Sequence, residues 1–381
     1  MIFHFDFATW RKMLHLAWGE PDAHTRRRIL RKLLVTVPLV ASFHALCFYL
    51  DGIFFPGLRH VEIRTPVFVV GHARSGTTLI HRLLGEDSER FCFFRLYEMH
   101  FPSLLQKRII RLGARLDRRL FGGFLERRVQ AFEERRYGRM RAVHKMGLRL
   151  AEEDDMIFYW SCASGFWITE MPYMGELDFY DVDHWPTGRR RRLMRFYRDC
   201  IKRQLLLDGK EKVFLSKAPV YAGRVETLIQ AFPDARFVVP LRSPEETIPS
   251  LLKLVSQGWQ RLAWDETRVK RCLRVLAEQS FATYRHPQEV LDQHPTVPRA
   301  MVDYRELATD PAKSVLQVYQ QLGFRVRPSQ REALLAEGKR SQKHVSSHTY
   351  SLEEFGLAAG EIRERLADLF ERYQWGGEGT A

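Results

Sequence analysis

Residues 66–84 read P-V-F-V-V-G-H-A-R-S-G-T-T-L-I-H-R-L-L, and this stretch decides the fold class. The apolar run of residues 67–70 predicts a buried parallel strand. A turn bounded by two glycines follows at residues 71–76, and Thr77 and Thr78 then open an apolar-periodic helix. Because backbone N–H groups and the helix dipole converge at such a helix start, the stretch predicts an anion-binding loop.

The loop differs at one position from the P-loop that binds nucleotide triphosphates. It has the G-x-x-x-x-G spacing, but Thr77 stands where that P-loop has a lysine. The cation lies instead at Arg74, two residues before Gly76. This exchange separates two enzyme classes, because a kinase or NTPase of the P-loop type needs the lysine and a metal-holding aspartate.

Composition narrows the class of partner and the compartment. A chain of 381 residues is long enough for one large α/β domain with additions. Its formal charge of +14 indicates an anionic partner, with a solvated basic surface as the alternative. The five cysteines are scattered without metal-ligand spacing, so we expect reduced thiols, no metal site and a cytoplasmic location.

The first 62 residues predict a helical N-terminal extension. Within it, residues 33–50 are largely apolar and follow a basic run. Three interpretations stay open: a helix that spans a membrane, an interfacial (monotopic) helix, and a helix packed on the domain. No secretory signal is evident. If the segment attaches to a membrane without spanning it, we expect a peripheral or monotopic attachment at the inner face.

Strand and helix signals alternate from residue 63 to the end of the chain. Further strands are expected at residues 212–216, 235–241 and 299–304, and helices at residues 77–84, 223–231, 244–254, 269–284 and 311–322. The alternation predicts an α/β fold, a P-loop-like doubly wound parallel sheet flanked by helices. Residues about 103–205 interrupt it and predict an arginine-rich helical insertion. We therefore divide the chain into an extension, residues 1–62, and one domain, residues 63–381.

A second anion-binding signal follows the strand expected at residues 235–241. Arg242 stands at its carboxyl end, and Ser250 comes eight residues later, two turns into the next helix. An arginine fork beside a hydroxyl group is a good phosphate grip. Two separate phosphate sites on one sheet suit a nucleotide that carries phosphates at both its 3′ and 5′ ends.

Four ordered motifs resemble those of the sulfotransferases that use 3′-phosphoadenosine 5′-phosphosulfate (PAPS). Residues 71–78 resemble the family's 5′-phosphosulfate loop, and Arg242 with Ser250 resembles its 3′-phosphate motif. L-S-K-A-P at residues 215–219 resembles the K-x-P strand end of the carbohydrate-acting and bacterial branches. Residues 302–324, with V-D-Y-R-E-L, D-P and L-G-F, resemble a late family stretch. The resemblance covers about residues 65–373.

The resemblance implies the reaction and the residues that carry it. The sulfuryl group would pass from PAPS to a hydroxyl acceptor, giving a sulfate ester and PAP, without a metal. The cofactor-binding residues would be Arg74, Ser75, Gly76, Thr77, Thr78, Arg242 and Ser250. Lys217 would stabilise the bridging oxygen or orient the acceptor. The general base would be Glu98, with His144 and His100 as alternatives.

The acceptor and the competing functions stay open from the sequence. We expect a small-molecule or lipid-linked hydroxyl acceptor, because the insertion is rich in aromatic residues and the N-terminal extension is apolar. An anionic membrane surface is a further partner to consider, and no nucleic acid is expected. The competing functions are a P-loop kinase or NTPase-like phosphoryl transferase and a non-catalytic protein that binds anionic membranes.

Overall fold

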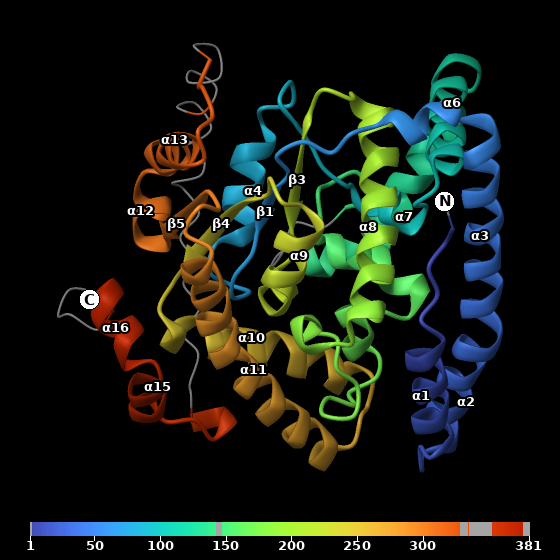
Figure 1. Cartoon of the computed structure of the whole chain (residues 1–381). Coiled ribbons are helices and arrows are strands. Elements are labelled where there is room, and N and C mark those ends of the chain that lie inside the picture. The colour runs from blue at the N-terminus through green and yellow to red at the C-terminus, as the bar shows by residue number, and fades with distance from the viewer. Residues whose placement is uncertain (1, 142–146, 328–333, 335–352, 376–381) are drawn as a thin grey trace. The chain divides into compact units, whose positions relative to one another are not determined.

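The computed structural model describes residues 2–141, 147–327, 334 and 353–375 (Figure 1). The chain forms two compact units, and each is described by itself. Unit 1 comprises Met1–Arg64, Ser88–Ser164 and Pro186–Ser216, and unit 2 comprises Thr65–Asp87, Gly165–Trp185 and Lys217–Ala381. Both anion-binding signals of the sequence lie in unit 2.

Unit 2 contains a parallel sheet with the strand order β1-β4-β5. These strands are β1 (Val67–Val69), β4 (Arg236–Leu241) and β5 (Arg299–Asp303). In the register, Phe68 lies opposite Phe237, and Val239 lies opposite Met301. All of β1 and all but the first residue of β4 are buried, which explains why both strands read as continuous apolar runs.

Helices follow the strands of unit 2, as the alternation in the sequence predicts. They are α4 (Thr77–Gly85), α9 (Val225–Ala231), α10 (Pro244–Arg261), α11 (Glu266–Gln293), α12 (Tyr304–Thr309), α13 (Pro311–Gln321), α15 (Ala359–Arg365) and α16 (Ala367–Tyr373). Pro244 and Pro311 open α10 and α13, at positions where a helix needs no N–H donor. The α/β fold with a parallel sheet flanked by helices is therefore confirmed.

Two helices of unit 2 continue beyond their expected ends. The helix expected at residues 244–254 reaches Arg261, and the one expected at residues 269–284 reaches Gln293. Each contains an internal proline, Pro249 or Pro287, which costs one backbone hydrogen bond. Both prolines are buried, and α10 packs against α11, so tertiary contacts outweigh that loss.

Unit 1 is mostly helical. β2 (Phe91–Cys92) pairs in parallel with β3 (Val213–Lys217). The helices are α1 (Phe7–Trp18), α2 (Ala23–Arg31), α3 (Val37–Phe54), α5 (Leu96–His100), α6 (Leu104–Leu120), α7 (Phe124–Arg141) and α8 (Thr187–Asp208), with a π-helical turn at Lys32–Thr36. The helical extension is confirmed. Between α7 and α8 the insertion is less regular, because the described part has only the short 3-10 helices η3 (Asp154–Ser161), η4 (Gly165–Thr169, in unit 2) and η5 (Val182–His184, in unit 2).

Buried polar contacts hold the N-terminal helices within unit 1. Asp51 of α3 pairs with Arg203 of α8 at 2.7 Å, and both side chains are fully buried. Before α1, the carboxylate of Asp6 accepts a hydrogen bond from Nε of Arg189 at 2.8 Å. The first 64 residues therefore share a core with the rest of unit 1, and a domain boundary near residue 62 stays a prediction.

Candidate functional site

The loop between β1 and α4 has no room for side chains at its two glycines. The φ angle is +131° at Gly71 and +92° at Gly76, a region that favours glycine. A Cβ atom on Gly76 would lie 2.8 Å from Cδ2 of Tyr304, and one on Gly71 would lie 3.2 Å from the carbonyl oxygen of Pro240. The loop is therefore held against α12 and β4, and its backbone follows one path.

Arg74 extends from this loop to the second anion-binding signal. Its Nε donates to Oγ of Ser250 in α10 at 3.1 Å, although the two residues are 176 positions apart. The backbone of Arg74 is left-handed, with φ at +73°, which costs about 1 kcal/mol for a residue with a side chain. Residues with a strained backbone conformation of this kind are found mostly at active sites and ligand-binding loops.

Arg242 lies beside the same loop, at the carboxyl end of β4. Its guanidinium group covers the ring of Tyr304 at 4.4 Å from the centroid, and its Nη1 lies 3.5 Å from the carbonyl oxygen of Arg74. Its Nε also donates to Glu246, in the first turn of α10, at 2.9 Å. Arg74, Ser250 and Arg242 therefore form one cluster, which we call the arginine–serine cluster. The Glu246 carboxylate occupies a position on Arg242 that a phosphate could take.

The start of α4 faces the loop with backbone donors. The first N–H groups of a helix have no acceptor inside the helix, and the positive end of its dipole lies there. Gly76 caps α4, and the first turn contains no acidic residue. Ser75 is buried, and its hydroxyl donates to the carbonyl oxygen of His72 at 2.6 Å, so its side chain shapes the loop. Thr77 is buried and Thr78 is half-buried.

Lys217 lies close to the base of the loop. It is the last residue of β3 and is fully buried. The N–H of the next residue, Ala218, donates to the carbonyl oxygen of Val69 in β1 at 3.3 Å. Lys217 and Ala218, both in unit 2, therefore lie beside the carboxyl end of β1, where ligands of parallel sheets bind.

His72 and Tyr284 join the two anion-binding segments, a pairing that the sequence did not predict. The two rings stack with centroids 5.0 Å apart, and the Tyr284 hydroxyl donates to the carbonyl oxygen of Arg242 at 2.7 Å. Nδ1 of His72 lies 2.6 Å from the carbonyl oxygen of Ala73, so the proton resides on Nδ1. Burial lowers the pKa of His72 to about 4 and raises the pKa of Tyr284, so both side chains are neutral at pH 7.

Acid should destabilise the protein in part through His72. Its folded-state pKa of about 4 lies below the ordinary 6.5, so the unfolded chain binds the proton first as the pH falls. The stabilisation is complete above pH 6.5 and is lost between pH 6.5 and 4, with about 2 kcal/mol lost by pH 5. Urea unfolding at pH 7 and pH 5 should show a smaller loss of stability for His72→Gln than for the wild type.

Three other histidines, all in unit 1, serve as controls for this experiment. Burial also lowers the pKa of His4 and His44 to about 4, so His72→Gln should keep part of the acid sensitivity. His24 is exposed, and His24→Gln should behave like the wild type. An equal loss of stability in His72→Gln and the wild type would contradict the account.

Glu98 lies in unit 1, fully buried at the third position of α5. One carboxylate oxygen accepts from the N–H of Arg95 at 2.9 Å and from Nε2 of Gln204 at 3.1 Å. The other accepts from Nη2 of Arg111 and from the hydroxyl of Tyr97, both at 2.8 Å. Glu98 is thus the centre of a buried hydrogen-bonded cluster, and as a base it would exchange one of these partners for the acceptor hydroxyl.

Of the other two candidate bases, the structure describes His100. His100 ends α5, and burial lowers its pKa, which favours the neutral form of the ring. His144 lies outside the described residues.

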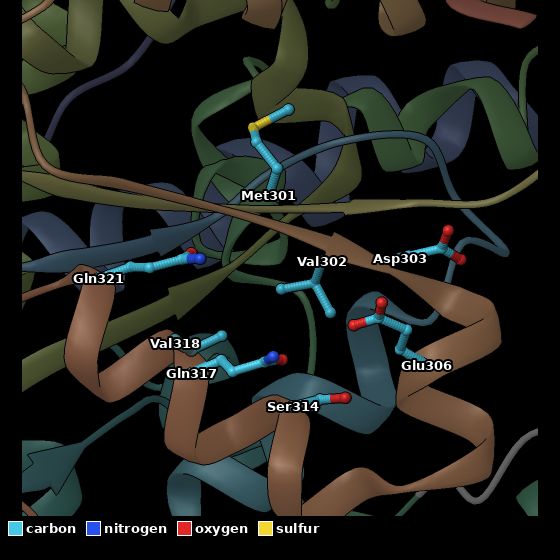
Figure 2. Close-up of a pocket in the computed structure, with 8 residues that line it drawn as sticks. All are labelled: Met301, Val302, Asp303, Glu306, Ser314, Gln317, Val318 and Gln321. Atoms are coloured by element: carbon cyan, nitrogen blue, oxygen red, sulfur yellow. The ribbon is translucent and has the colours of Figure 1, made fainter. Parts of the chain in front are cut away.

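A small pocket shares no lining residue with the arginine–serine cluster. Figure 2 shows it between the end of β5, α12 and α13, with Asp303, Glu306, Ser314 and Gln317 around it. Its lining contains none of the residues that the sequence predicts for the site. The pocket therefore contributes nothing to the functional assignment.

The fold and the cluster together define a class of protein. A parallel sheet whose first strand passes through a glycine loop into a helix is P-loop-like, and the arginine–serine cluster adds a second anion-binding segment. Residues 66–328 match the model of the Sulfotransferase family, which is more than half of the chain, so the chain belongs to this family. The predicted resemblance is confirmed, and the family favours sulfuryl transfer over phosphoryl transfer.

Curated relatives lie within the same family. The chain is similar to the omega-hydroxy-beta-dihydromenaquinone-9 sulfotransferase Stf3 of Mycobacterium bovis and of Mycobacterium tuberculosis. The identity is 26% over 285 residues, which cover 68% of this chain and 63% of each relative. The chain therefore matches somewhat less than two thirds of the length of these relatives.

Solved structures support the fold. The chain is similar to sulfotransferase STF9 of Mycobacterium avium, with a TM-score of 0.73 and 17% identity over 100% of this chain and 95% of the other. For sulfotransferase STF1 of Mycobacterium tuberculosis H37Rv the TM-score is 0.65, with 18% identity over 96% and 94% of the two chains. At these identities the similarity shows a common fold.

Proposed function

We propose that the chain transfers the sulfuryl group of PAPS to a hydroxyl acceptor and releases a sulfate ester and PAP. One observation carries the proposal: Nε of Arg74 donates to Oγ of Ser250 at 3.1 Å, which joins the glycine loop to the second anion-binding segment. A nucleotide with phosphates at its 5′ and 3′ ends needs two such segments side by side. Family membership supplies the reaction class.

Sulfuryl transfer, like phosphoryl transfer, depends on alignment and on neutralising charge at the leaving oxygen. In our proposal Arg74, the hydroxyls of Thr77 and Thr78, and the N–H groups from Ser75 to Thr78 hold the 5′-phosphosulfate. Gly76 lets the backbone approach it closely. The donor set fits the ligand, because arginine forks, hydroxyls and a helix start are the groups that bind phosphate in proteins.

The other proposed site residues would bind the 3′-phosphate of the nucleotide or contact the reacting atoms. Arg242 and Ser250 would bind the 3′-phosphate, with Arg242 exchanging Glu246 for it. Lys217, at the end of β3, would neutralise the bridging oxygen that becomes part of PAP. For the base that takes the acceptor proton we propose Glu98, with His144 and His100 as the alternatives. We propose no metal.

For the acceptor we propose a hydroxyl on a lipid-like molecule. The name of the Stf3 relatives gives them an omega-hydroxylated dihydromenaquinone as substrate. In this chain, Ala23–Phe54 is a continuous helix of 32 residues with a mean hydropathy of 2.0 in its most apolar window, only 33% of which is buried. These two observations support an enzyme that attaches to a membrane. We propose that it is cytoplasmic and attaches peripherally at the inner face.

Nucleotide binding should distinguish this proposal from a kinase or NTPase. PAP at a hundred times its Kd should stabilise the native state by about 2.7 kcal/mol. AMP, which lacks only the 3′-phosphate, should bind more weakly, and ATP with magnesium should not be hydrolysed. Thermal unfolding with PAP and with AMP measures the difference in binding, and release of inorganic phosphate measures ATP hydrolysis.

Arg242→Ala gives the matching control for the 3′-phosphate. Removing one charged hydrogen-bond partner typically costs about 1.5–3 kcal/mol, so PAP should lose most of its advantage over AMP in this variant. Equal stabilisation of the wild type by PAP and AMP would reject the proposed 3′ site, and turnover of ATP would favour the kinase alternative.

A further inference from the structure

The outward face of α3 is largely apolar. Its large exposed side chains are Leu39, Phe43, Leu46, Tyr49, Ile53 and Phe54, and Leu34 and Val35 of the preceding π-helical turn continue the same face; all eight are between 49% and 66% exposed. Steps of three and four residues place most of them on one side of the helix. The sequence contains no charged residue between Lys32 and Asp51. Soluble monomers seldom expose so large an apolar patch, so this face needs a partner.

The opposite face of α3 is fixed to unit 1 by buried polar groups. The carboxylate of Asp51 pairs with Arg203 and accepts from the N–H groups of Leu104 and Leu105, at 3.0 and 2.8 Å, at the start of α6. The ring of His44 lies 3.0 Å from the side-chain nitrogen of Gln106. A helix that crossed a bilayer would lose these contacts and leave the buried guanidinium of Arg203 without Asp51, which is strongly destabilising. The contacts favour a helix that lies along the membrane.

The turn between α6 and α7 exposes a second apolar group, which we call the hairpin tip: Leu120, Phe121, Phe124 and Leu125, between 52% and 69% exposed. Asp117 fixes the turn, because its carboxylate accepts from the N–H groups of Leu125 and Glu126, both at 3.0 Å. The exposed apolar residues Ile109, Leu112 and Leu116 continue the group back along α6. The hairpin tip is thus an ordered apolar projection.

Basic side chains flank both apolar groups. Arg118, Arg119, Arg127 and Arg128 surround the hairpin tip, and the guanidinium of Arg128 lies 5.8 Å from the ring centroid of Phe124. Arg26, Arg27, Arg28, Arg31 and Lys32 precede α3 in the same continuous helix. Exposed apolar side chains bordered by arginine and lysine match an interface of acyl chains and anionic headgroups. This charge complementarity identifies the partner.

We propose that the α3 face and the hairpin tip seat unit 1 on an anionic phospholipid bilayer, with α3 lying in the interface plane. In Figure 1, α3 runs along one edge of unit 1, and α6 begins at its carboxyl-terminal end. Membrane binding would bring the enzyme to its acceptor, because a lipid-linked hydroxyl lies at the bilayer. Only this link to the acceptor rests on the proposed function.

Vesicle flotation tests the proposal without turnover. The full chain should float with vesicles of phosphatidylcholine and phosphatidylglycerol, float less with phosphatidylcholine alone, and bind more weakly as salt rises. Phe43→Ser with Leu46→Ser on α3, and Phe121→Ser with Phe124→Ser at the hairpin tip, should each weaken binding at least tenfold. Leu254→Ser, an exposed leucine of α10 in unit 2, is the matched control and should bind like the wild type.

The outcomes separate this proposal from its alternatives and from the enzyme assignment. Failure to float with anionic vesicles, or unchanged flotation of both double variants, would overturn it. So would a wild-type dimer that the α3 variant converts to a monomer, because a second copy would then cover the face. Resistance of the bound chain to alkaline carbonate would indicate a spanning helix and overturn the interfacial placement. The variants should bind PAP normally, so a failure of PAP binding in every form would reject the proposed function alone.

Discussion

Arg74→Ala should lower kcat/KM for sulfuryl transfer by about 10³-fold. In our proposal the guanidinium holds the 5′-phosphosulfate and shares with Lys217 the charge that grows on the leaving oxygen, so its loss weakens the transition state more than the ground state. Contact with Ser250 would be lost as well, which loosens the link between the two anion-binding segments. The measurement is the rate of PAP release in the presence of PAPS and a hydroxyl acceptor.

Arg82→Ala is the matched control for this prediction. It removes the same charge from the last turn of the same helix, α4, and should leave the rate close to that of the wild type. Thermal unfolding of both variants would show whether the loop still folds. An Arg74→Ala enzyme that is folded and keeps a rate within tenfold of the wild type would exclude Arg74 from the transition state.

Glu98→Gln should lower kcat by about 10²- to 10⁴-fold, because glutamine cannot accept the proton of the acceptor hydroxyl. The affinity for PAP should hardly change, since we place Glu98 outside the nucleotide-binding residues. Glutamine keeps the size of the side chain and one of the two acceptor oxygens, so part of the cluster with Arg95, Tyr97 and Arg111 should survive. The measurement is turnover and PAP affinity in parallel.

A structural role of Glu98 would give a different pattern. Glu98 is fully buried, and removing the charge from a buried partner of an ion pair is destabilising, so a structural Glu98 would lower both the unfolding temperature and the PAP affinity. Glu62→Gln, an exposed carboxylate of unit 1, controls for loss of charge. Near-normal turnover of Glu98→Gln would transfer the role of base to His100 or His144.

Local signals explain what the sequence predicted well. The strand–loop–helix segment depends on neighbours in the chain: an apolar run, two glycines with positive φ, and a helix start. The pairing of Arg74 with Ser250 crosses 176 positions, and the predicted parallel sheet together with the resemblance of ordered motifs brought the two segments together. Motif order thus carried information that local pattern could not.

The remaining features depend on tertiary contacts that leave no local trace. His72 stacks on Tyr284, which lies more than 200 positions away on a helix with no other signal of function. β2 is two residues long, too short for any periodicity. α11 passes through Pro287, where a proline ordinarily ends a helix, because that proline is buried.

Incubation of the chain with sulfur-labelled PAPS and a whole-cell lipid extract tests the central claim most directly. We predict that the label passes to a hydroxyl-bearing lipid as a sulfate ester, that PAP appears in equal amount, and that Arg74→Ala slows the transfer by about 10³-fold. Label that stays in PAPS, or appears only as inorganic sulfate, while the folded chain binds PAP would contradict the account.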